Sequence, residues 1–374
     1  MDADSLLEPF ALIPGLTLRN RVAMAPMTTW AADDDGTVSH EEEAWYRRRV
    51  GDVGLVITGC THVQANGVGF TGEFAAHDDS FIPSLARLAI AAKSGGAPAI
   101  LQIFHAGGKT RSDLVADVVA ASAVEGEAGP FSDALMPRAL ADAEVEAVVQ
   151  AFGDATRRAI IAGFDGVELH GAHGFLLQNF LSPHSNRRGD RWGGSLKGRQ
   201  RFPLEVVAQV RHVIATCANR PFALGYRLTC DEPYDDGLRM ADSLVLVDGL
   251  IGAGIDYLHA SLGQALDARP VDAPEGPAII TILRDHLAGR IPLIAAGQIR
   301  TPLQAKQALN MGLSAVAIGQ ALVMNPDWVA QLCGETTTMR ELAIGPEDVA
   351  PLAVPPKLWR IIASTPGWFP ARGA

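Results

Sequence analysis

The sequence is poor in the features that mark secreted, membrane-spanning and metal-clustered proteins. Its four cysteines stand at 60, 217, 230 and 333 with no short ligand spacing, so neither a disulfide framework nor a structural zinc or iron–sulfur site is expected. No run of about 18 apolar residues occurs, and the N-terminus lacks the basic and then apolar order of a signal peptide. We therefore expect a cytoplasmic protein with no membrane partner.

Positive charge is also in deficit. The 31 lysines and arginines are outnumbered by 42 aspartates and glutamates, which leaves a formal charge of -11. A phosphate backbone attracts clusters of basic residues, so we expect a small-molecule substrate and no nucleic acid. Hydrophobic residues make up 48% of the 374 positions, which is enough for a large core.

Short apolar segments alternate with helical stretches along the chain. Eight of them are predicted to be strands, at 22–24, 55–58, 99–104, 167–169, 223–226, 257–260, 291–295 and 315–318. Strands that alternate with helices form right-handed parallel units, and eight such units in roughly 300 residues fit a closed barrel. The predicted fold is α/β: a single (β/α)8 TIM-barrel domain over residues 1–374, with extra loops over its C-terminal face and a C-terminal tail from about 340 to 374.

The segment before the fourth strand shows how the helices are expected to pack. Apolar residues recur there at helical spacing, with Asp142 as the expected N-cap and Gly163 as the stop. Two long polar segments, 107–140 and 181–200, follow strands and are expected to lie over the top of the barrel. The aromatic-rich tail is expected either to dock on a second subunit, giving a homo-oligomer, or to pack back on its own barrel.

Residues 67–72 have the sequence GVGFTG, the glycine pattern of dinucleotide-binding folds. That pattern binds a pyrophosphate only where it joins a strand directly to the N-terminus of a helix. Here further residues separate it from the preceding strand, and the next helical pattern starts only near Ser80. We expect a flexible loop rather than a nucleotide site.

His170 and His173 stand where the fourth apolar strand ends. Strand alternation places Glu168 and His170 on one face of that strand, and His173 follows in the loop. Two imidazoles held close together can donate hydrogen bonds to one oxygen, or they can ligate a metal. The alternative is that one of them only satisfies a loop carbonyl group.

Polar groups also end other predicted strands, on the face where barrel enzymes carry out chemistry. They include Thr28, Gln102 and Arg227. Strands seven and eight end in Gly297-Gln298 and Gly319-Gln320, where a glycine lets backbone N–H groups approach a phosphate. A phosphate-bearing cofactor at that corner is therefore predicted.

Six segments of the chain carry a common signature. They are LRNRVAMAPMT at 18–28, GLVITG at 54–59, LQIFHAG at 101–107, GFDGVELHGAH at 163–173, NFLSPHSNRRGDRWGG at 179–194 and IGQALVMNPD at 318–327. In this order, from about residue 5 to 335, the chain resembles the Old Yellow Enzyme family of NAD(P)H:flavin oxidoreductases. The His-x-x-His pair and the lack of a cysteine cluster after the barrel resemble its bacterial single-domain ene-reductase branch.

The resemblance implies non-covalent FMN across the barrel mouth, with NAD(P)H as the hydride donor. The implied cofactor residues are Ala25, Pro26, Met27 and Thr28 along the ring, Gly59, Gln102 at the pyrimidine edge, Arg227 near N1 and O2, and Gly297, Gln298, Gly319 and Gln320 around the phosphate. Arg227 would raise the reduction potential of the flavin. For Gln102 and Arg227 the alternative is an ordinary buried polar network. His170 and His173 are the implied catalytic pair, which stabilises the enolate formed from an enone.

Several positions depart from the family pattern. Phe175 replaces the tyrosine that protonates the α-carbon, so the implied acceptor is an activated alkene or, as the alternative, a quinone-type or other electron acceptor. Gln320 replaces an arginine beside the phosphate, for which Arg300 is a candidate substitute, although a solvated loop position is expected for it. Gly108 replaces another arginine, and Trp30 joins Phe175 in a substrate pocket that we expect to be unusually apolar.

Two further functional classes stay open. One is a metal-dependent barrel hydrolase built on His170 and His173, for which no third ligand is found, so that no metal is expected. The other is a flavin-binding protein that lost catalysis with Phe175.

Overall fold

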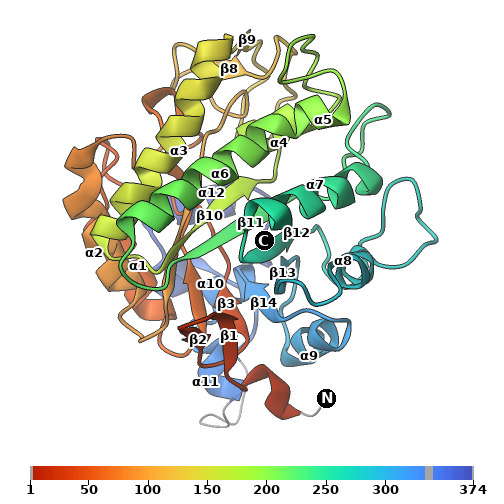
Figure 1. Cartoon of the computed structure of the whole chain (residues 1–374). Coiled ribbons are helices and arrows are strands. Elements are labelled where there is room, and N and C mark those ends of the chain that lie inside the picture. Colours follow the sequence, from red (N-terminus) through yellow and green to blue (C-terminus); the bar gives the residue numbers. More distant parts are fainter. Residues whose placement is uncertain (1–2, 333–339, 373–374) are drawn as a thin grey trace.

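The computed structural model describes residues 3–332 and 340–372 (Figure 1). Within these ranges, eight parallel strands pair side by side and close into a barrel, because β10 pairs with β7 as well as with β11. In barrel order they are β3 (Val22–Met24), β4 (Leu55–Ile57), β7 (Ala99–Phe104), β10 (Gly166–Gly171), β11 (Ala223–Leu228), β12 (Tyr257–Ser261), β13 (Leu293–Ala296) and β14 (Ala315–Ile318). The predicted (β/α)8 fold is confirmed.

The strands differ from the predicted segments mainly at their C-terminal ends. β10 continues through His170 and Gly171, which pair with Arg227 and Leu228 of β11. β12 continues through Ser261. Strand pairing therefore holds the backbone of the polar residues that end these strands.

Helices cover the outside of the barrel. The longer ones are α1 (His40–Arg49), α2 (Ile82–Ala92), α3 (Asp142–Ala162), α6 (Arg201–Cys217), α7 (Met240–Ala253), α8 (Ile279–Leu287) and α9 (Pro302–Asn310). α3 buries its apolar stripe as predicted and ends at Gly163, whose φ of 94° lies in the left-handed region that glycine tolerates. The expected N-cap is wrong: Ala141 is the cap, and the Asp142 carboxylate instead accepts a hydrogen bond from the Trp192 indole and pairs with Arg191.

A hairpin closes the end of the barrel from which the strands start. It consists of β1 (Phe10–Ile13) and β2 (Leu16–Leu18) and lies at the lower end of the barrel in Figure 1. Its Leu12 and Leu18 pack with small and apolar side chains inside the barrel, among them Ala23, Ile57 and Ile100. The opposite end stays free for the long loops.

The two long polar segments lie together over the C-terminal end of the barrel, as predicted. Segment 107–140 contains the paired strands β8 (Val119–Ala120) and β9 (Arg138–Ala139), at the top of Figure 1. Segment 181–200, which contains α5 (Leu196–Arg199), follows α4 (Leu176–Leu181). Arg188 joins the two segments by donating to the carbonyl oxygens of Ala121 at 2.9 Å and Leu140 at 2.6 Å.

The glycines at 67–72 allow close packing. A Cβ atom on Gly67 would lie 3.0 Å from the His105 ring, and one on Gly72, whose φ is 63°, would lie 2.5 Å from the carbonyl oxygen of Trp30. The Glu73 carboxylate accepts hydrogen bonds from the N–H groups of residues 69 and 70. The segment is a loop, as expected, and these contacts pack it against its surroundings. The segment joins the short helix η2 (Ala65–Gly67) to β6 (Phe74–Ala75), which lies beside β5 (Thr61–His62), rather than a strand to a helix.

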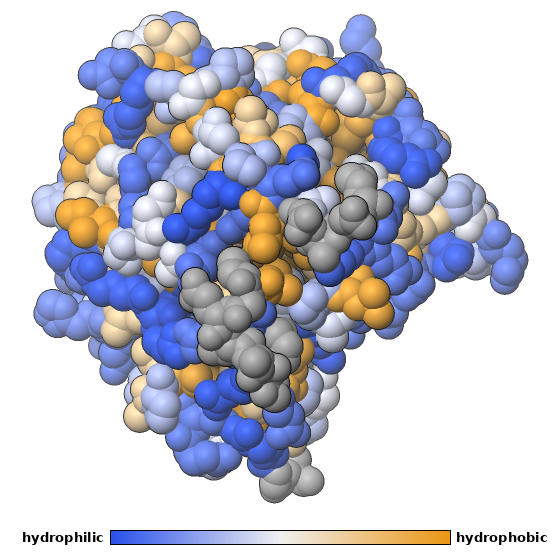
Figure 2. All heavy atoms as spheres, turned by 90° about the horizontal axis from the view of Figure 1, so that it is seen from below, coloured by the Kyte–Doolittle hydropathy of each residue, from blue (hydrophilic) through white to orange (hydrophobic). Residues whose placement is uncertain are grey.

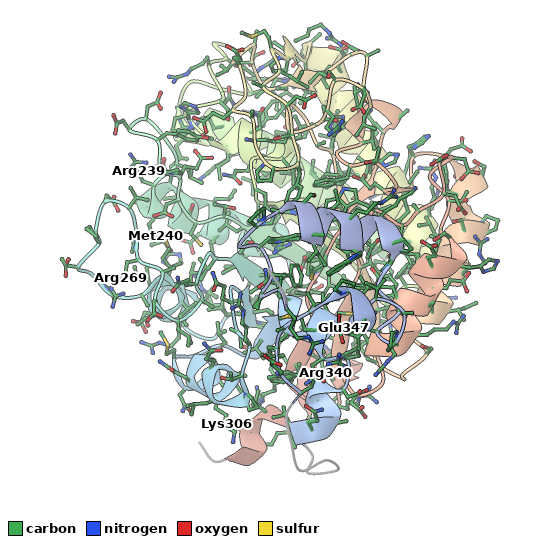
Figure 3. All side chains as sticks on the ribbon, turned by 180° about the vertical axis from the view of Figure 1, so that it is seen from behind. Arg239, Met240, Arg269, Lys306, Arg340 and Glu347 are labelled. Carbon is green, nitrogen blue, oxygen red and sulfur yellow. The ribbon has the colours of Figure 1, made fainter. Side chains whose placement is uncertain are left out.

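The C-terminal tail packs back on its own barrel. Seen from behind, its helix α12 (Pro356–Ser364) crosses the middle of the molecule, with Arg340 and Glu347 below it (Figure 3). Arg372 pairs with Glu347 at 3.1 Å and also with Asp348. Of the two expectations for the tail, the structure shows this one, and a homo-oligomer stays a prediction.

The surface seen from below is mainly hydrophilic, with apolar side chains in small separate patches (Figure 2). Within residues 3–332 and 340–372, no helix has both the length and the apolar character that crossing a bilayer requires. Cys60, Cys217 and Cys230 are free thiols, and Cys333 lies outside the described residues.

Glu42, on α1, carries a carboxyl group that is fully buried. Its Oε2 accepts a hydrogen bond from the Thr29 hydroxyl at 2.5 Å, and its Oε1 has no protein partner. Burial raises the pKa of Glu42 to about 7, although Thr29 and Arg49 favour the ionised form. Because the pKa is higher in the folded state, this group stabilises the fold fully below pH 4.5, and that stabilisation is lost as the pH rises through 7.

We expect Glu42→Gln, which imitates the protonated carboxyl, to stabilise the protein at about pH 8.5 and to have little effect near pH 5. The gain should be on the order of 2 kcal/mol, because each unit of pKa shift corresponds to about 1.4 kcal/mol. Urea unfolding at both pH values measures it. Glu41→Gln, at an exposed neighbouring position, is the matched control. Equal unfolding free energies for wild type and Glu42→Gln at the higher pH would contradict the expectation.

Candidate active site

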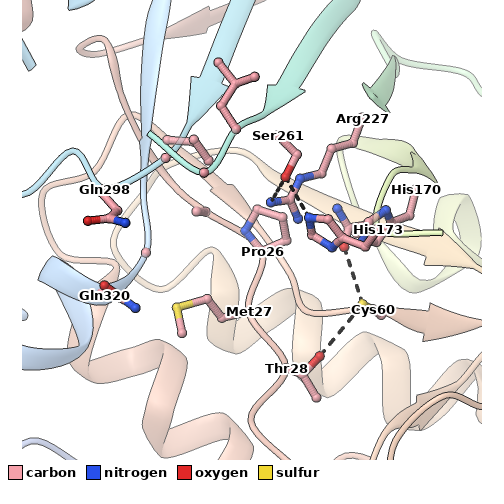
Figure 4. A pocket seen from close by; sticks show the side chains of 18 of the residues that line it. Pro26, Met27, Thr28, Cys60, His170, His173, Arg227, Ser261, Gln298 and Gln320 are labelled. Atoms are coloured by element: carbon pink, nitrogen blue, oxygen red, sulfur yellow. Dashed lines mark hydrogen bonds between the residues drawn. The ribbon is translucent and has the colours of Figure 1, made fainter. Parts of the chain in front are cut away.

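A cavity of about 410 Å³ opens at the C-terminal end of the barrel. Residues at or just after the ends of all eight strands contribute to its wall. Of the residues predicted for the site, those on the wall are Ala25, Pro26, Met27, Thr28, Trp30, Gln102, His170, His173, Phe175, Arg227, Gly297, Gln298, Gly319 and Gln320. In the close-up, Gln298 and Gln320 lie on one side and His170, His173 and Arg227 on the other, with Pro26 and Met27 between them (Figure 4).

Gly59 is the exception among the predicted residues. It lies behind the wall, where a Cβ atom would be 2.5 Å from the carbonyl oxygen of Met27 and 3.6 Å from the Cα of Thr28. Its N–H donates to the Tyr46 hydroxyl at 2.9 Å. The structure therefore gives Gly59 a packing role, which lets residues 27 and 28 lie close to the end of β4.

The two histidines meet as expected. Their ring centroids lie 4.9 Å apart at an interplanar angle of 75°. The Nδ1 atom of His170 accepts a hydrogen bond from the N–H of Ala172 at 3.3 Å, so the proton of a neutral His170 lies on Nε2. The Nε2 atom of His173 lies 2.7 Å from the Ser261 hydroxyl oxygen, and the backbone N–H of His173 donates to Thr229 at 3.1 Å.

Both imidazoles are neutral at physiological pH. Desolvation at the cavity wall, together with the positive charge of Arg227, lowers the pKa of His173 to about 3, and burial holds the pKa of His170 well below its ordinary value. A neutral imidazole has one N–H donor. The pair can therefore donate hydrogen bonds to a ligand oxygen, but at neutral pH it holds no extra proton to give to carbon.

A buried carboxylate orients the polar groups below the cavity. Glu168 is fully buried and accepts hydrogen bonds from the Gln102 amide at 2.7 Å, the Tyr257 hydroxyl at 3.0 Å and His259 Nδ1 at 3.0 Å. Burial alone would raise the pKa of Glu168, but His259, Arg227 and Gln102 together hold it below its ordinary value. Because a carboxylate only accepts, the amide nitrogen of Gln102 must face Glu168, which leaves its oxygen on the other side.

Arg227 is buried on β11 beside the histidines. Its Nη2 donates to Ser261 at 3.0 Å, and its buried Nε has no protein partner. A buried donor without a partner is costly unless a ligand completes it. Ser261 thus links Arg227 to His173, as the dashed lines in Figure 4 show.

The corner after β13 and β14 fits a phosphate group. Gly297 packs closely against the backbone after β12, where a Cβ atom on it would lie 2.5 Å from the Leu262 carbonyl oxygen. Arg300 lies on the cavity wall, donates from Nη2 to the Gln320 amide oxygen at 2.8 Å, and has a buried Nε without a protein partner. The expected solvated position of Arg300 is therefore wrong. The charge missing at Gln320 is present in the neighbouring side chain, which β13 and the following turn carry into the corner.

Backbone strain gathers at this site. Outside glycine, five described residues have positive φ values, and three of them line the cavity: Trp30 at 54°, His173 at 62° and Gln298 at 50°. Side chains larger than glycine or asparagine rarely adopt this region, and such strain persists where the surrounding structure imposes it at functional sites.

Some wall residues were not predicted from the sequence. Ser261 ends β12, so the rule that barrel strands end at the site would have found it if the strand had been extended by one residue. Phe70, Phe131 and Trp368 come from loops and the tail, and nothing in their local sequence marked them. Cys60 lies 3.6 Å from the Gln102 amide oxygen, and burial raises the pKa of its thiol to about 12.

Comparisons with known proteins agree with this arrangement. Residues 5–337 match the NADH:flavin oxidoreductase / NADH oxidase family. The chain belongs to this family. It is 40% identical over 367 residues to the probable NADH-dependent flavin oxidoreductase YqiG of Bacillus subtilis (strain 168), a match that covers 98% of this chain and 97% of that protein. This is the family that the sequence resembled, so the chain is an NAD(P)H-dependent flavin oxidoreductase with non-covalent FMN.

Two further family relatives show different extents of likeness. The NADH:fumarate oxidoreductase of Klebsiella pneumoniae (strain 342) is 39% identical over 363 residues, which are 96% of this chain and 39% of that longer protein. Morphinone reductase in complex with tetrahydroNAD superposes with a TM-score of 0.76 at 28% identity, covering 90% of this chain and 92% of that one.

The residues present fit FMN. The unpartnered Nε donors of Arg227 and Arg300 suit an anionic cofactor. The donor set does not fit the metal alternative, because within the described residues no group of three His, Cys, Asp or Glu side chains is arranged to hold a metal ion.

Proposed function

We propose that this flavin oxidoreductase passes a hydride from NADH, by way of FMN, to a small conjugated carbonyl compound. Two acceptor classes fit: an activated alkene such as an enone, and a quinone. The observation that carries the proposal is the pair of neutral imidazoles on the wall of the cavity, whose ring centroids lie 4.9 Å apart. A cytoplasmic location, expected from the sequence, belongs to the same proposal.

The side chains of the wall would hold the cofactor in the way that the family resemblance implies. When bound, FMN supplies a carrier that accepts two electrons from NAD(P)H and passes them on. Ala25, Pro26, Met27 and Thr28 would lie along its ring, Gln102 and Arg227 at its pyrimidine edge, and Gly297, Gln298, Gly319 and Gln320 with Arg300 at its phosphate. A permanent positive charge at Arg227 stabilises negative charge on the reduced cofactor.

The histidine pair acts on the acceptor. Nε2–H of His170 and an N–H of His173 would donate to the acceptor's carbonyl oxygen, where negative charge develops as the hydride arrives. Ser261 and the Ala172 N–H hold the two rings in place before the acceptor binds. The pair therefore stabilises developing charge without reorientation.

The lack of a proton donor beside the acceptor supports a quinone as the acceptor. Reduction of an alkene needs a proton at carbon, and Phe175, whose ring lies 4.8 Å from the His170 ring, has none to give. Reduction of a quinone needs a proton only at oxygen, which water supplies readily. The neutral histidines and Phe175 together support a quinone-type acceptor, with alkene reduction as the slower reaction.

The donor is proposed to be NADH. The Bacillus subtilis relative, which matches nearly the whole chain, is named as NADH-dependent. Anaerobic titration of the FMN-loaded protein with NADH should bleach the flavin absorption, and adding 1,4-benzoquinone or cyclohex-2-enone should restore it. Protein that NADH does not bleach, or that neither acceptor reoxidises, would contradict the proposed function.

Phe175→Tyr tests the missing proton donor. We expect the rate of enone reduction to rise about tenfold, which is less than the roughly 10²–10⁴-fold that a well-placed general acid contributes. The rate of benzoquinone reduction should stay within about twofold, which makes it the internal control. Stopped-flow reoxidation of the reduced protein measures both rates. An unchanged enone rate would mean that water already delivers the proton.

A further inference from the structure

One residue of the C-terminal tail, Trp368, reaches the cavity. After α12, a turn at Gly367, whose φ is 82°, brings Trp368 to the barrel mouth. There the carbonyl oxygen of Trp368 accepts a hydrogen bond from the Gln320 amide at 2.5 Å. Behind it, the N–H of Arg372 donates to the Ile344 carbonyl oxygen at 2.9 Å. The position of Trp368 is therefore held from the barrel and from the tail.

Trp368 joins two aromatic rings that are distant in sequence. Its ring centroid lies 6.0 Å from that of Trp30 and 5.4 Å from that of Phe131, and the last two lie 5.3 Å from each other. We call these three residues the aromatic roof. Phe70 continues the aromatic surface from Trp30, at 5.7 Å, to Phe175, at 6.2 Å, and so to the histidine pair.

Two features mark the roof as a place for a flat, uncharged ligand. The charged residues on the described cavity wall are Arg227 and Arg300, which contact Ser261 and Gln320 rather than the roof. Trp30 is held in the left-handed region, which a bulky residue adopts only where its surroundings impose it. Aromatic edges and faces attract other π systems at such distances.

We propose that Trp368 determines the specificity of the acceptor site. With its carbonyl oxygen at His170 and His173, an acceptor places its far side under the aromatic roof. The roof admits a flat conjugated ring and excludes one with a bulky substituent on that side. The inference rests on the proposed function, because it takes the histidine pair as the place of the carbonyl oxygen.

The test compares two acceptors of equal chemistry and different bulk. kcat/KM for 1,4-benzoquinone and for tert-butyl-1,4-benzoquinone is measured with wild type, Trp368→Phe and Trp368→Ala. We expect wild type to prefer the flat quinone, and Trp368→Ala to raise the bulky-to-flat ratio about tenfold, with Trp368→Phe between them. Trp359→Ala, a tail tryptophan on α12 that does not line the cavity, is the matched control and should leave the ratio unchanged.

A second measurement does not depend on turnover. The Kd values of acetophenone and 4-tert-butylacetophenone for the oxidised protein, read from the flavin spectrum, should change in ratio in the same direction. Loss of all turnover in wild type would overturn the proposed function, while the Kd ratio would still decide the role of Trp368. Ratios in Trp368→Ala equal to those of wild type would overturn the inference. If that variant does not fold, an unshifted ratio in Trp368→Phe overturns it.

Discussion

Replacing His170 with alanine is expected to slow reoxidation of the reduced protein by a quinone or an enone about 100-fold. The reason is that removing one preorganised donor to a developing oxyanion costs about 10²–10³-fold in rate. Replacing His173 should have a similar effect. The double variant should lose little more than either single one, because groups that act as a unit are not additive.

The measurement isolates the step in which the histidines are proposed to act. The protein is reduced chemically and then mixed with the acceptor in a stopped-flow instrument, so that NADH is absent. His286→Ala is the control, because His286 lies on α8 and pairs with Asp248 at 3.0 Å, away from the cavity. A His170→Ala rate within threefold of wild type would contradict the proposed role of the histidine pair, and with it the proposed function.

The expected pH dependence follows from the lowered pKa values of the two histidines. Because the pKa of His173 lies at about 3, neither imidazole gains a proton as the pH falls from 8 to 5. The wild-type reoxidation rate should therefore show no titration near pH 6.5, where a histidine with an unperturbed pKa changes charge. A rate that follows such a titration would mean that an imidazolium takes part.

Arg227→Met is expected to weaken FMN binding about 100-fold and to lower the flavin midpoint potential by about 30 mV or more. A charge-assisted hydrogen bond is worth about 1.5–3 kcal/mol, which corresponds to roughly ten- to hundredfold in Kd, and about 30 mV corresponds to 1.4 kcal/mol for two electrons. The weaker binding and the lower potential have two causes. The buried Nε of Arg227 is a donor without a protein partner, and its removal leaves Glu168 with less positive charge nearby.

Riboflavin lacks the phosphate of FMN. Comparing the binding of the two flavins therefore distinguishes residues that contact the ring from residues that contact the phosphate. Arg227→Met should weaken FMN and riboflavin binding by the same factor, whereas Arg300→Met should weaken FMN binding alone. Quenching of flavin fluorescence measures the Kd of each flavin for wild type and for each variant, and Arg47→Met, on the exposed side of α1, serves as the control. An effect of Arg227→Met confined to FMN would place Arg227 at the phosphate instead of the ring.

Local patterns predicted the barrel well because its elements are regular. Each strand candidate is apolar and short, and each is followed by a helical stretch, so handedness and closure follow from general rules. The errors lie where side chains from distant segments compete. Asp142 has the chemistry of an N-cap, but Arg191 and Trp192 of a later loop take its carboxylate. The glycines at 67–72 have the spacing of a nucleotide loop, but they serve the packing around His105 and Trp30.

The residues of the site also fall into two groups, those that the sequence could predict and those that it could not. The residues at strand ends were predictable, since parallel strands bring their C-terminal ends to one rim. The location of Arg300 and the contribution of Trp368 were not, because both depend on Gln320, which binds the Arg300 guanidinium on one side and the tail carbonyl group on the other. Nothing in the sequence near either residue encodes that contact.

By itself, the order of residues determined an eight-stranded barrel, a set of strand-end residues that resembles a flavin site, and a histidine pair. These features depend on local periodicity and on short motifs. Only the tertiary structure decided the protonation pattern of the histidines, the positive charge at the phosphate corner and the aromatic roof. Burial, hydrogen-bond partners and ring contacts depend on residues that lie hundreds of positions apart, and folding alone brings them together.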